Sequence, residues 1–435
     1  MEWFKKAAFY HIYPLGYCGE LSPNDFTSEP TGKILSVIDQ IPAIKEMGFN
    51  AVYFGPVFES VKHGYDTADY RVIDRRLGTN EDFAKVCKAL HESGIRVVLD
   101  GVFNHVGREF WAFREVRQTD RKSGYRDWFH LRDGNSAYND GFYYEGWEGH
   151  YDLVKLNLYN PQVREHIKEC ITQWVKEFDI DGLRLDVAYC LDLNFLKELH
   201  GHCKWLKEDF WLMGETLHGD YNKWMNPEML DSVTNYECYK GLYSSFNDMN
   251  MFEIAHSINR QFGNENWCLY RGKSLYCFLD NHDVSRIATM LKNKAHLKPI
   301  YALLFTMPGI PAVYYGSEFA WEADKKNGDD GLRVPYQKQE PTELTDYISK
   351  LAKFHTESLP LCAGSYRQLH LQNHSYAFAR EYEGETVVSM INAGEDFTFN
   401  VGIGGTYEDI LSGETFDLSG GVPVSTHNAR VFKKI

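Results

Sequence analysis

Apolar residues over the first 320 positions follow two alternating patterns. Short runs rich in β-branched and aromatic residues alternate with longer stretches in which apolar residues recur at helical spacing. This alternation is typical of repeated β/α units, and eight parallel strands fit a closed barrel. The runs that predict strands are Phe9–Tyr13, Ala51–Phe54, Arg96–Asp100, Gly182–Asp186, Trp211–Glu215, Ser232–Asn235, Leu275–Asp280 and Ala312–Tyr315.

Four stretches between these runs predict amphipathic helices. Pro161 follows Asn160, which is the pattern of a first-turn proline behind an N-cap. Gly48 and Gly94 each follow a helical stretch at the position where left-handed backbone ends a helix. The predicted helices are Ile34–Met47, Glu81–Ser93, Pro161–Phe178 and Asn194–Lys207.

Two regions depart from the β/α pattern. Residues 103–157 are too long for a barrel connection and are rich in Gly, Asp, Tyr and Trp, so they predict an inserted subdomain after the third strand. After about residue 355, alternating runs and glycine-containing turns predict an antiparallel β-sandwich. The predicted fold is an α/β protein with a (β/α)8 barrel over 1–102 and 158–354, the insertion at 103–157 and a β-domain at 355–435.

Charge and composition exclude several classes of function. The chain has 46 Lys and Arg against 61 Asp and Glu, a formal net charge of -15, which argues against binding to a nucleic-acid backbone. No apolar stretch has the length of a secretory signal or a membrane span. The nine cysteines include no CxxC pair, so free thiols are favoured. We expect a cytoplasmic protein that binds neither nucleic acid nor membrane.

Ionisable residues end three of the predicted strands. Alternation along a strand places Arg184 and Asp186 on the same face, inside a barrel, where the arginine would hold Asp186 ionised. Glu215 ends the next apolar run, where a drier setting would raise its pKa, and Asp283 follows His282 at another strand end. A charged and a protonated carboxyl on one sugar are what retaining glycoside hydrolysis requires.

Each of these residues also has an ordinary structural interpretation. A lone Arg-x-Asp on a strand is more often a buried ion pair than a catalytic site, and His282 with Asp283 could cap a helix. Glu215 alone is equally unspecific. Their occurrence together at the ends of separate strands favours a shared site, because parallel strands bring their carboxyl ends to one face of a barrel.

Four segments in order resemble the α-amylase family of glycoside hydrolases, with matches over about residues 9–335. They are Asp100-Gly-Val-Phe-Asn-His105, Gly182-Leu-Arg-Leu-Asp-Val-Ala188, Gly214-Glu215 and Phe278 to Asp283. The resemblance implies that Asp186 is the nucleophile, Glu215 the general acid and base, and Asp283 a carboxylate that grips the sugar hydroxyls. It implies sugar contacts for Tyr65, His105, Arg184, His282, Asp329 and Arg333.

Finer features resemble the neopullulanase and cyclomaltodextrinase branch of this family. Val154 to Asn157, Val187-Ala188 and Asp231 to Tyr236 carry that resemblance. The printed chain does not include the N-terminal β-domain with which those enzymes usually dimerise, so the oligomeric state stays open. Tyr189-Cys190 stands where many α-amylases have Lys-His. No cofactor or metal is required, and Asn104 is the one motif-matched candidate ligand for calcium.

The sequence therefore predicts a retaining hydrolase of α-1,4-glucosidic bonds in starch-derived maltooligosaccharides. Cyclomaltodextrinase or neopullulanase activity is the first alternative. Transglycosylation on the same active site is the second, because a sugar hydroxyl instead of water can intercept the same intermediate. A non-catalytic carbohydrate-binding protein on this fold is the third, and the intact set of three acids argues against it.

Overall fold

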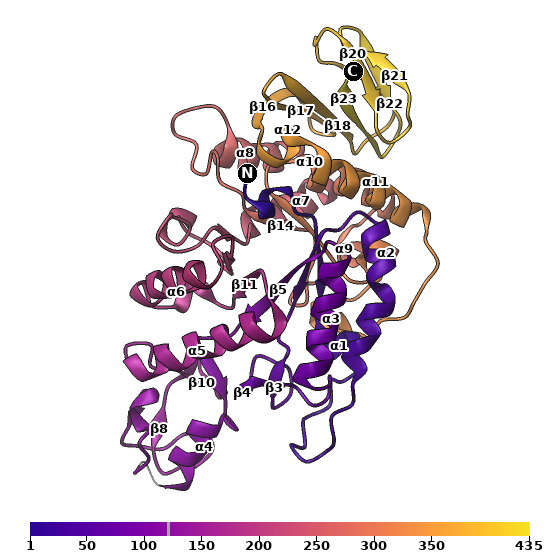
Figure 1. Cartoon of the computed structure of the whole chain (residues 1–435). Helices are drawn as coiled ribbons and strands as arrows, with labels where there is room; N and C mark the ends of the chain where they lie inside the picture. The colour runs from indigo at the N-terminus through magenta and orange to yellow at the C-terminus, as the bar shows by residue number, and fades with distance from the viewer. Residues whose placement is uncertain (120–121) are drawn as a thin grey trace.

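All eight predicted strands form one parallel sheet that curls into a barrel in the computed structural model, which describes residues 1–119 and 122–435 (Figure 1). Their order is β13-β12-β11-β5-β2-β1-β15-β14. A parallel bridge between Thr234 and Tyr276 connects the two edge strands. The strands are β1 (Phe9–Ile12), β2 (Ala51–Phe54), β5 (Arg96–Gly101), β11 (Gly182–Leu185), β12 (Trp211–Gly214), β13 (Ser232–Val233), β14 (Tyr276–Phe278) and β15 (Ile310–Tyr314).

The inside of the barrel has an apolar layer below a polar one. Phe9 of β1 is in register with Ala51 and Ala312, and its ring stacks on Trp211 with centroids 5.1 Å apart. Two residues further along β1, His11 is in register with Tyr53. Because side chains alternate along a strand, residues two apart share the inner face. The polar layer therefore faces the carboxyl ends of the strands.

The helices around the barrel follow the prediction except for the first. The stretch predicted as a helix over Ile34–Met47 divides into a 3-10 helix, η2 (Lys33–Gln40), and an α-helix, α2 (Ile41–Glu46). Pro42 lies in the first turn of α2, where its missing N–H is tolerated, whereas a continuous α-helix would need that N–H bonded to residue 38. The other three are confirmed as α3 (Asn80–Glu92), α5 (Pro161–Phe178) and α6 (Leu193–Leu206).

Further helices lie in the second half of the barrel. Helix α10 (Leu297–Thr306) is buried at every residue except Lys298, because it lies between the barrel and the C-terminal sheet. The remaining helices are α1 (Pro14–Tyr17), α7 (Tyr236–Asn247), α8 (Met251–Phe262), α9 (Ile287–Met290), α11 (Glu343–Glu357) and α12 (Leu359–Ala363). No helix among the described residues combines the length and apolarity needed to cross a bilayer.

The segment after β5 leaves the barrel and forms small sheets at the lower end of the molecule in Figure 1. Strands β6 (His105–Gly107), β10 (His150–Lys155) and β9 (Gly146–Trp147) form an antiparallel sheet. Strands β7 (Leu131–Arg132) and β8 (Tyr143–Tyr144) pair beside it, and α4 (Trp111–Gln118) packs nearby. An earlier hairpin of β3 (Phe58–Ser60) and β4 (Thr67–Ile73) carries Tyr65 in its turn.

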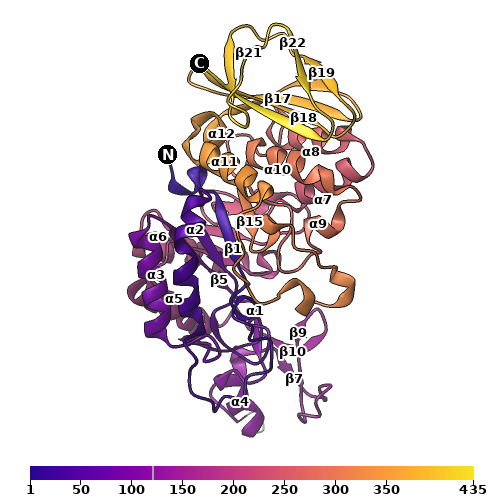
Figure 2. The same ribbon diagram turned by 90° about the vertical axis from the view of Figure 1, so that its right-hand side faces the viewer.

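The C-terminal region is an antiparallel β-sandwich at the opposite end of the molecule (Figure 2). Six strands form one sheet in the order β16-β17-β18-β23-β20-β21, and β19 pairs with β22. A separate apolar cluster that includes Phe399, Val422 and Phe432 fills the space between these sheets. The strands are β16 (Ser365–Leu371), β17 (Ser375–Tyr382), β18 (Glu385–Asn392), β19 (Phe397–Asn400), β20 (Thr406–Asp409), β21 (Thr415–Asp417), β22 (Gly421–Val424) and β23 (Asn428–Lys434).

Candidate active site

The guanidinium of Arg184 connects three carboxylates at the carboxyl end of the barrel. Its Nη1 donates to Asp186 Oδ1 at 2.9 Å and to Asp100 Oδ1 at 3.0 Å. Its Nη2 lies 2.9 Å from Glu215 Oε2. Asp100, Asp186 and Glu215 come from β5 and from the residues directly after β11 and β12, three neighbouring strands. The structure thus places Asp186 and Glu215 side by side on one cation.

Asp283 belongs to a second ion-pair group beside the first. Its carboxylate lies 3.0 Å from His282 Nε2 and 3.0 Å from Arg333 Nη2. Arg333 also contacts Asp329 at 3.4 Å and donates through Nε to the carbonyl of His282 at 3.1 Å. The loop after β15 therefore holds the loop after β14, which fixes the direction of the Asp283 carboxylate.

Tyr65 joins the two groups. Its hydroxyl donates to Asp100 Oδ2 at 3.0 Å and contacts His282 Nε2, and its ring lies parallel to the His282 ring with centroids 5.5 Å apart. Tyr53 also donates to Asp100 Oδ2, at 2.7 Å. Asp100 thus accepts bonds from Arg184 and from both tyrosines. The inner polar layer is one connected network.

A pocket of about 660 Å³ opens above this network. Seven of the nine predicted site residues line it, and Arg184 and His282 lie directly behind them, bonded to Asp186 and Asp283. The inserted segment contributes one wall, with Trp147 stacked on His150 at a centroid distance of 5.7 Å. The predicted residues that line the pocket are Tyr65, His105, Asp186, Glu215, Asp283, Asp329 and Arg333.

Burial changes the protonation of the central carboxyls. It raises the pKa of Asp186 well above its usual range and raises that of Glu215, while Arg184 acts in the opposite direction on both. The expectation that Arg184 keeps Asp186 ionised therefore omits desolvation, which is the larger effect. Because both carboxyls share one guanidinium, they take up protons as a pair.

The pKa values of Asp283 and His105 are lowered, whereas those of Asp186 and Glu215 are raised. Burial acts to raise the pKa of Asp283, but His282, Arg333 and Arg184 outweigh it and hold that pKa well below its usual range. Burial lowers the pKa of His105 to about 3, so its imidazole is neutral at neutral pH. His105 Nε2 lies 3.8 Å from Asp186 Oδ2 and has no hydrogen-bond partner among the described residues. It is free to contact a ligand in the pocket.

Val187 holds Glu215 from the backbone. Its N–H donates to Glu215 Oε2 at 2.9 Å. Its φ is 38°, in the left-handed region that a β-branched residue rarely adopts. The turn is closed by the N–H of Cys190, which donates to the carbonyl of Val187 at 2.8 Å. Strain of this kind persists where the surroundings fix it, and it is common at active sites.

The site residues that were not selected from the sequence include Asp100, Tyr53 and Trp147. Asp100 stands in the first matched motif, and the alternation of side chains along β5 places it on the inner face of the barrel, in register with Arg184. That alternation was the available signal. The same alternation places Tyr53 on the inner face of β2, in register with His11. Trp147 had no local signal, because its position depends on the pairing of β9 with β10.

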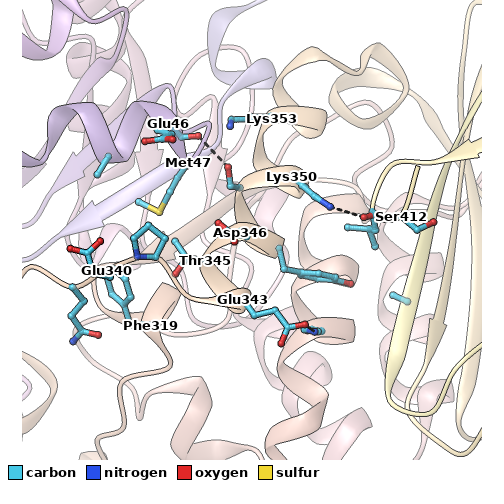
Figure 3. Close-up of a pocket in the computed structure, with 18 of the residues that line it drawn as sticks. Glu46, Met47, Phe319, Glu340, Glu343, Thr345, Asp346, Lys350, Lys353 and Ser412 are labelled. Carbon is cyan, nitrogen blue, oxygen red and sulfur yellow. Dashed lines mark hydrogen bonds and ion pairs between the residues drawn. The ribbon is translucent and has the colours of Figure 1, made fainter. Parts of the chain in front are cut away.

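A larger cavity, of about 830 Å³, lies away from these acids (Figure 3). It is lined by α2, α11 and the β-domain, and its residues include Glu46, Asp346, Lys350 and Ser412. Oppositely charged side chains are mixed along it, and Lys350 Nζ donates to the carbonyl of Leu411 at 2.7 Å. It contains none of the predicted site residues.

A metal site is not formed by the charged side chains of the described residues. No group of three or more His, Cys, Asp or Glu side chains gathers there in a way that could hold an ion. The side-chain amide of Asn104 contacts His105 Nδ1 at 3.2 Å, and the backbone carbonyl of Asn104 accepts from Leu156 N at 3.0 Å. Asn104 stays an untested candidate ligand, and no step below uses calcium.

Comparisons with known proteins bear on the family to which this chain belongs. The family model for the alpha amylase catalytic domain matches residues 20–353. A cyclomaltodextrinase from Thermoanaerobacter pseudethanolicus is 29% identical over 416 residues, covering 90% of this chain and 71% of the relative. Neopullulanase 2 from Thermoactinomyces vulgaris is 30% identical over 440 residues, covering 95% and 74%.

A solved structure matches the whole chain. The ligand-free cyclic alpha-maltosyl-(1→6)-maltose hydrolase from Arthrobacter globiformis has a TM-score of 0.85 and 28% identity, and all of each chain is covered. The predicted barrel and β-sandwich thus agree with an enzyme of known structure, and the family model spans more than half of the sequence. The chain belongs to the alpha-amylase family of glycoside hydrolases.

Proposed function

We propose that this enzyme hydrolyses α-1,4-glucosidic bonds of short maltooligosaccharides, linear or cyclic, with retention of configuration. The observation that carries the proposal is the pairing of Asp186 and Glu215 on the two Nη atoms of Arg184, each at 2.9 Å. Retaining enzymes need closely spaced carboxyls, about 5 to 5.5 Å apart, whereas inverting enzymes keep them about 6.5 to 9.5 Å apart to admit a water.

In the first step, Asp186 attacks the anomeric carbon while Glu215 protonates the glycosidic oxygen. The bond to the leaving sugar breaks, and a covalent glycosyl ester forms on Asp186. In the second step Glu215, now ionised, takes a proton from water, and the water oxygen displaces the carboxylate. Arg184 remains bonded to Asp186 and Glu215 in the free enzyme and offsets their charge.

The raised pKa values of Asp186 and Glu215 support a pair of carboxyls that holds one proton. The proposed roles place one proton of the buried pair on Glu215 for the first step, which leaves Asp186 ionised as the nucleophile. The negative charge of Asp283 acts to raise the pKa of Glu215 further. Since Asp283 itself is held ionised, it can accept hydrogen bonds from the sugar hydroxyls throughout the reaction.

The size of the substrate follows from the pocket and the relatives. A pocket of about 660 Å³ falls within the range of roughly 300 to 1,000 Å³ typical of small-ligand sites. Trp147 from the insertion and Leu217 from the loop after β12 bound it. Because relatives named cyclomaltodextrinase and cyclic maltosyl-maltose hydrolase match most or all of the chain, we include cyclic oligosaccharides.

Product analysis tests the proposal. Maltoheptaose, β-cyclodextrin, pullulan and starch are incubated with the enzyme, products are separated by chromatography, and the anomer released first is identified by NMR. We expect α-anomers and higher rates on the two short substrates than on starch. Release of the β-anomer would contradict the retaining mechanism, and products longer than maltoheptaose would assign a transferase.

Two substitutions test the roles. We expect Asp186→Asn and Glu215→Gln each to lower kcat on maltoheptaose by roughly a thousandfold or more while the oligosaccharide still binds. Glu208→Gln, at an exposed position outside the site, serves as the control and should leave kcat unchanged. Wild-type activity in Asp186→Asn would exclude the assigned nucleophile.

A further inference from the structure

A small cavity of about 260 Å³ lies at the end of the barrel opposite the active site. Ser274 and Gly309, which line it, precede β14 and β15, so the cavity lies at the amino ends of strands whose carboxyl ends face the catalytic pocket. The N-terminal 3-10 helix η1 (Trp3–Lys6), the loop after α8 and the start of β16 complete its wall. Figure 1 shows the N-terminus close to α12 in this region.

The charges that line this cavity are all positive. They are Lys5, Arg271, Lys273 and Arg380, and the lining contains no Asp or Glu. The chain as a whole has a formal net charge of -15. Lys5 pairs with Glu2, outside the lining, at 3.1 Å. Arg271, Lys273 and Arg380 have no such ion pair among the described residues, and together with Lys5 they would attract a small anion. We propose that the cavity binds a phosphate group, either as inorganic phosphate or on a monosaccharide.

Arg380 is the buried centre of this site. Its side chain is 2% exposed, and its Nε, Nη1 and Nη2 donate to the carbonyls of Ser365, Thr306 and Gly364 at 3.2, 3.2 and 3.0 Å. The carbonyls of Thr306 and Gly364 lie at the ends of α10 and α12, so Arg380 also satisfies helix C-termini, and Ser365 begins β16. The described residues provide no carboxylate for it, and burial lowers its pKa to about 10.

Lys273 and Arg271 likewise have only neutral partners among the described residues. Lys273 Nζ donates to the carbonyl of Met225 at 2.7 Å and to Asn222 Oδ1, and burial lowers its pKa. Arg271 Nη1 donates to the carbonyl of Asn264 at 2.6 Å. Neutral acceptors satisfy N–H groups but add no counter-charge, and Asp220 acts on Lys273 only from a distance, where burial outweighs it. An anion in the cavity supplies that counter-charge.

The chemistry of the lining selects the ligand class. A cavity below roughly 300 Å³ is smaller than sites for drug-sized ligands, so a phosphate or a monosaccharide phosphate fits and an oligosaccharide does not. Arginine guanidinium groups bind phosphate oxygens through paired N–H donors. A cluster of lysine and arginine side chains without carboxylates favours binding of such an anion. Gly272 and Gly364 in the wall also let the ligand approach the backbone closely.

Calorimetric titration with inorganic phosphate and with glucose 6-phosphate tests the proposal, at constant ionic strength set by NaCl. We expect saturable binding of at least one of them to the wild type. The double variant Lys5→Gln/Arg271→Gln removes two cations at the edge of the cavity, and we expect it to bind about tenfold or more weakly. The control, Lys88→Gln/Arg114→Gln, removes two exposed cations elsewhere and should bind like the wild type.

The outcomes separate the possibilities. Equal affinity for both probes assigns inorganic phosphate as the ligand, and tighter glucose 6-phosphate binding assigns a monosaccharide phosphate. Absence of saturable binding by either probe, or equal weakening in the control, would overturn the proposal. Activity of both double variants on maltoheptaose verifies that they are folded, because none of the four residues lies in the catalytic pocket.

Discussion

Arg184 shows how one side chain can control the chemistry of several others. It is buried, and its two Nη atoms bond to Asp100, Asp186 and Glu215. An ammonium could not replace it, because only a planar guanidinium presents several fixed donors in different directions. The proton that the proposed reaction needs is therefore held on a pair of carboxyls, and Arg184 lowers the pKa of both against the effect of burial.

Val187 offers a test of how Glu215 is held. The substitution Val187→Gly removes the side chain that resists a φ of 38° but also frees the peptide to rotate, so the N–H bond to Glu215 loosens. That bond lowers the pKa of Glu215, and its loss raises the pKa. We expect the alkaline limb of the kcat/KM profile to move to higher pH, with kcat reduced. Val187→Ala keeps a Cβ and serves as the control, in which we expect the alkaline limb to shift less. An unchanged alkaline limb in Val187→Gly would contradict the role of Val187 in holding Glu215.

At this scale the sequence located the acids but not their ionisation. Asp186, Glu215 and Asp283 could be chosen because each follows an apolar run that ends at the barrel mouth. The effect of burial on Asp186 could not be predicted, because it depends on how completely other segments exclude water. Asp100 was overlooked as a site residue although it accepts the bonds that join Arg184 to Tyr53 and Tyr65.

Among the elements, the β9–β10 hairpin positions Trp147 in the pocket wall. A Cβ on Gly146 would lie 2.2 Å from the carbonyl oxygen of His150, so Gly146→Ala must displace the hairpin. We expect KM for maltoheptaose to rise severalfold, with kcat and the melting temperature changed less, because the acids lie on barrel strands. Gly124→Ala, where a Cβ meets no atom within 4 Å, is the control. An unchanged KM would show that Trp147 does not contact the substrate.

The contact between β1 and the turn after β15 makes the stability pH-dependent. Glu318 is buried in that turn, Tyr10 donates to its Oε1 at 2.6 Å, and burial raises its pKa to about 7. The folded state therefore keeps this proton between about pH 4.5 and 7, where the unfolded chain has lost it. Stability from this group is fully present below pH 4.5 and is lost as the pH rises towards 7, by about 3 kcal/mol.

The variant Glu318→Gln cannot titrate. We expect its free energy of unfolding, measured with urea, to match that of the wild type near pH 4.5 and to exceed it by up to about 3 kcal/mol above pH 7. The difference between the two proteins isolates Glu318 from other buried acids such as Asp280, whose pKa burial also raises. Parallel curves for the two proteins across this range would contradict the assignment.

The predicted helices each have one face in water, whereas the missed helices include the buried α10 and also the amphipathic α8 and α11. Helices α3, α5 and α6 have apolar residues on one side only, which gives the helical period. Helix α10 is buried almost throughout, so its sequence contains no polar face to reveal it. Pro42 was the signal that the helix over 34–47 would divide, since a proline inside a helical pattern ends the preceding segment.

For the whole molecule, the alternation of β and α patterns was enough to predict the barrel. The interface between the barrel and the β-domain could not be predicted from that alternation. That interface depends on contacts between α10 and strands β18 and β23, far apart in the sequence. Phe378 and Val431 of the β-domain belong to the same apolar cluster as the residues of α10. The catalytic and C-terminal parts therefore share one core.

This shared core predicts that the β-domain is required for the barrel to stay in solution. Truncation after residue 364 would expose the side of α10 that contacts β18 and β23, on a helix whose residues other than Lys298 are all buried in the intact chain. Exposed apolar patches of this kind cause association. We expect the truncated chain to sediment with the insoluble fraction, whereas the full chain melts in one calorimetric transition. A soluble, monomeric truncated chain that hydrolyses maltoheptaose would show that the barrel folds independently, because its active-site acids all precede the cut.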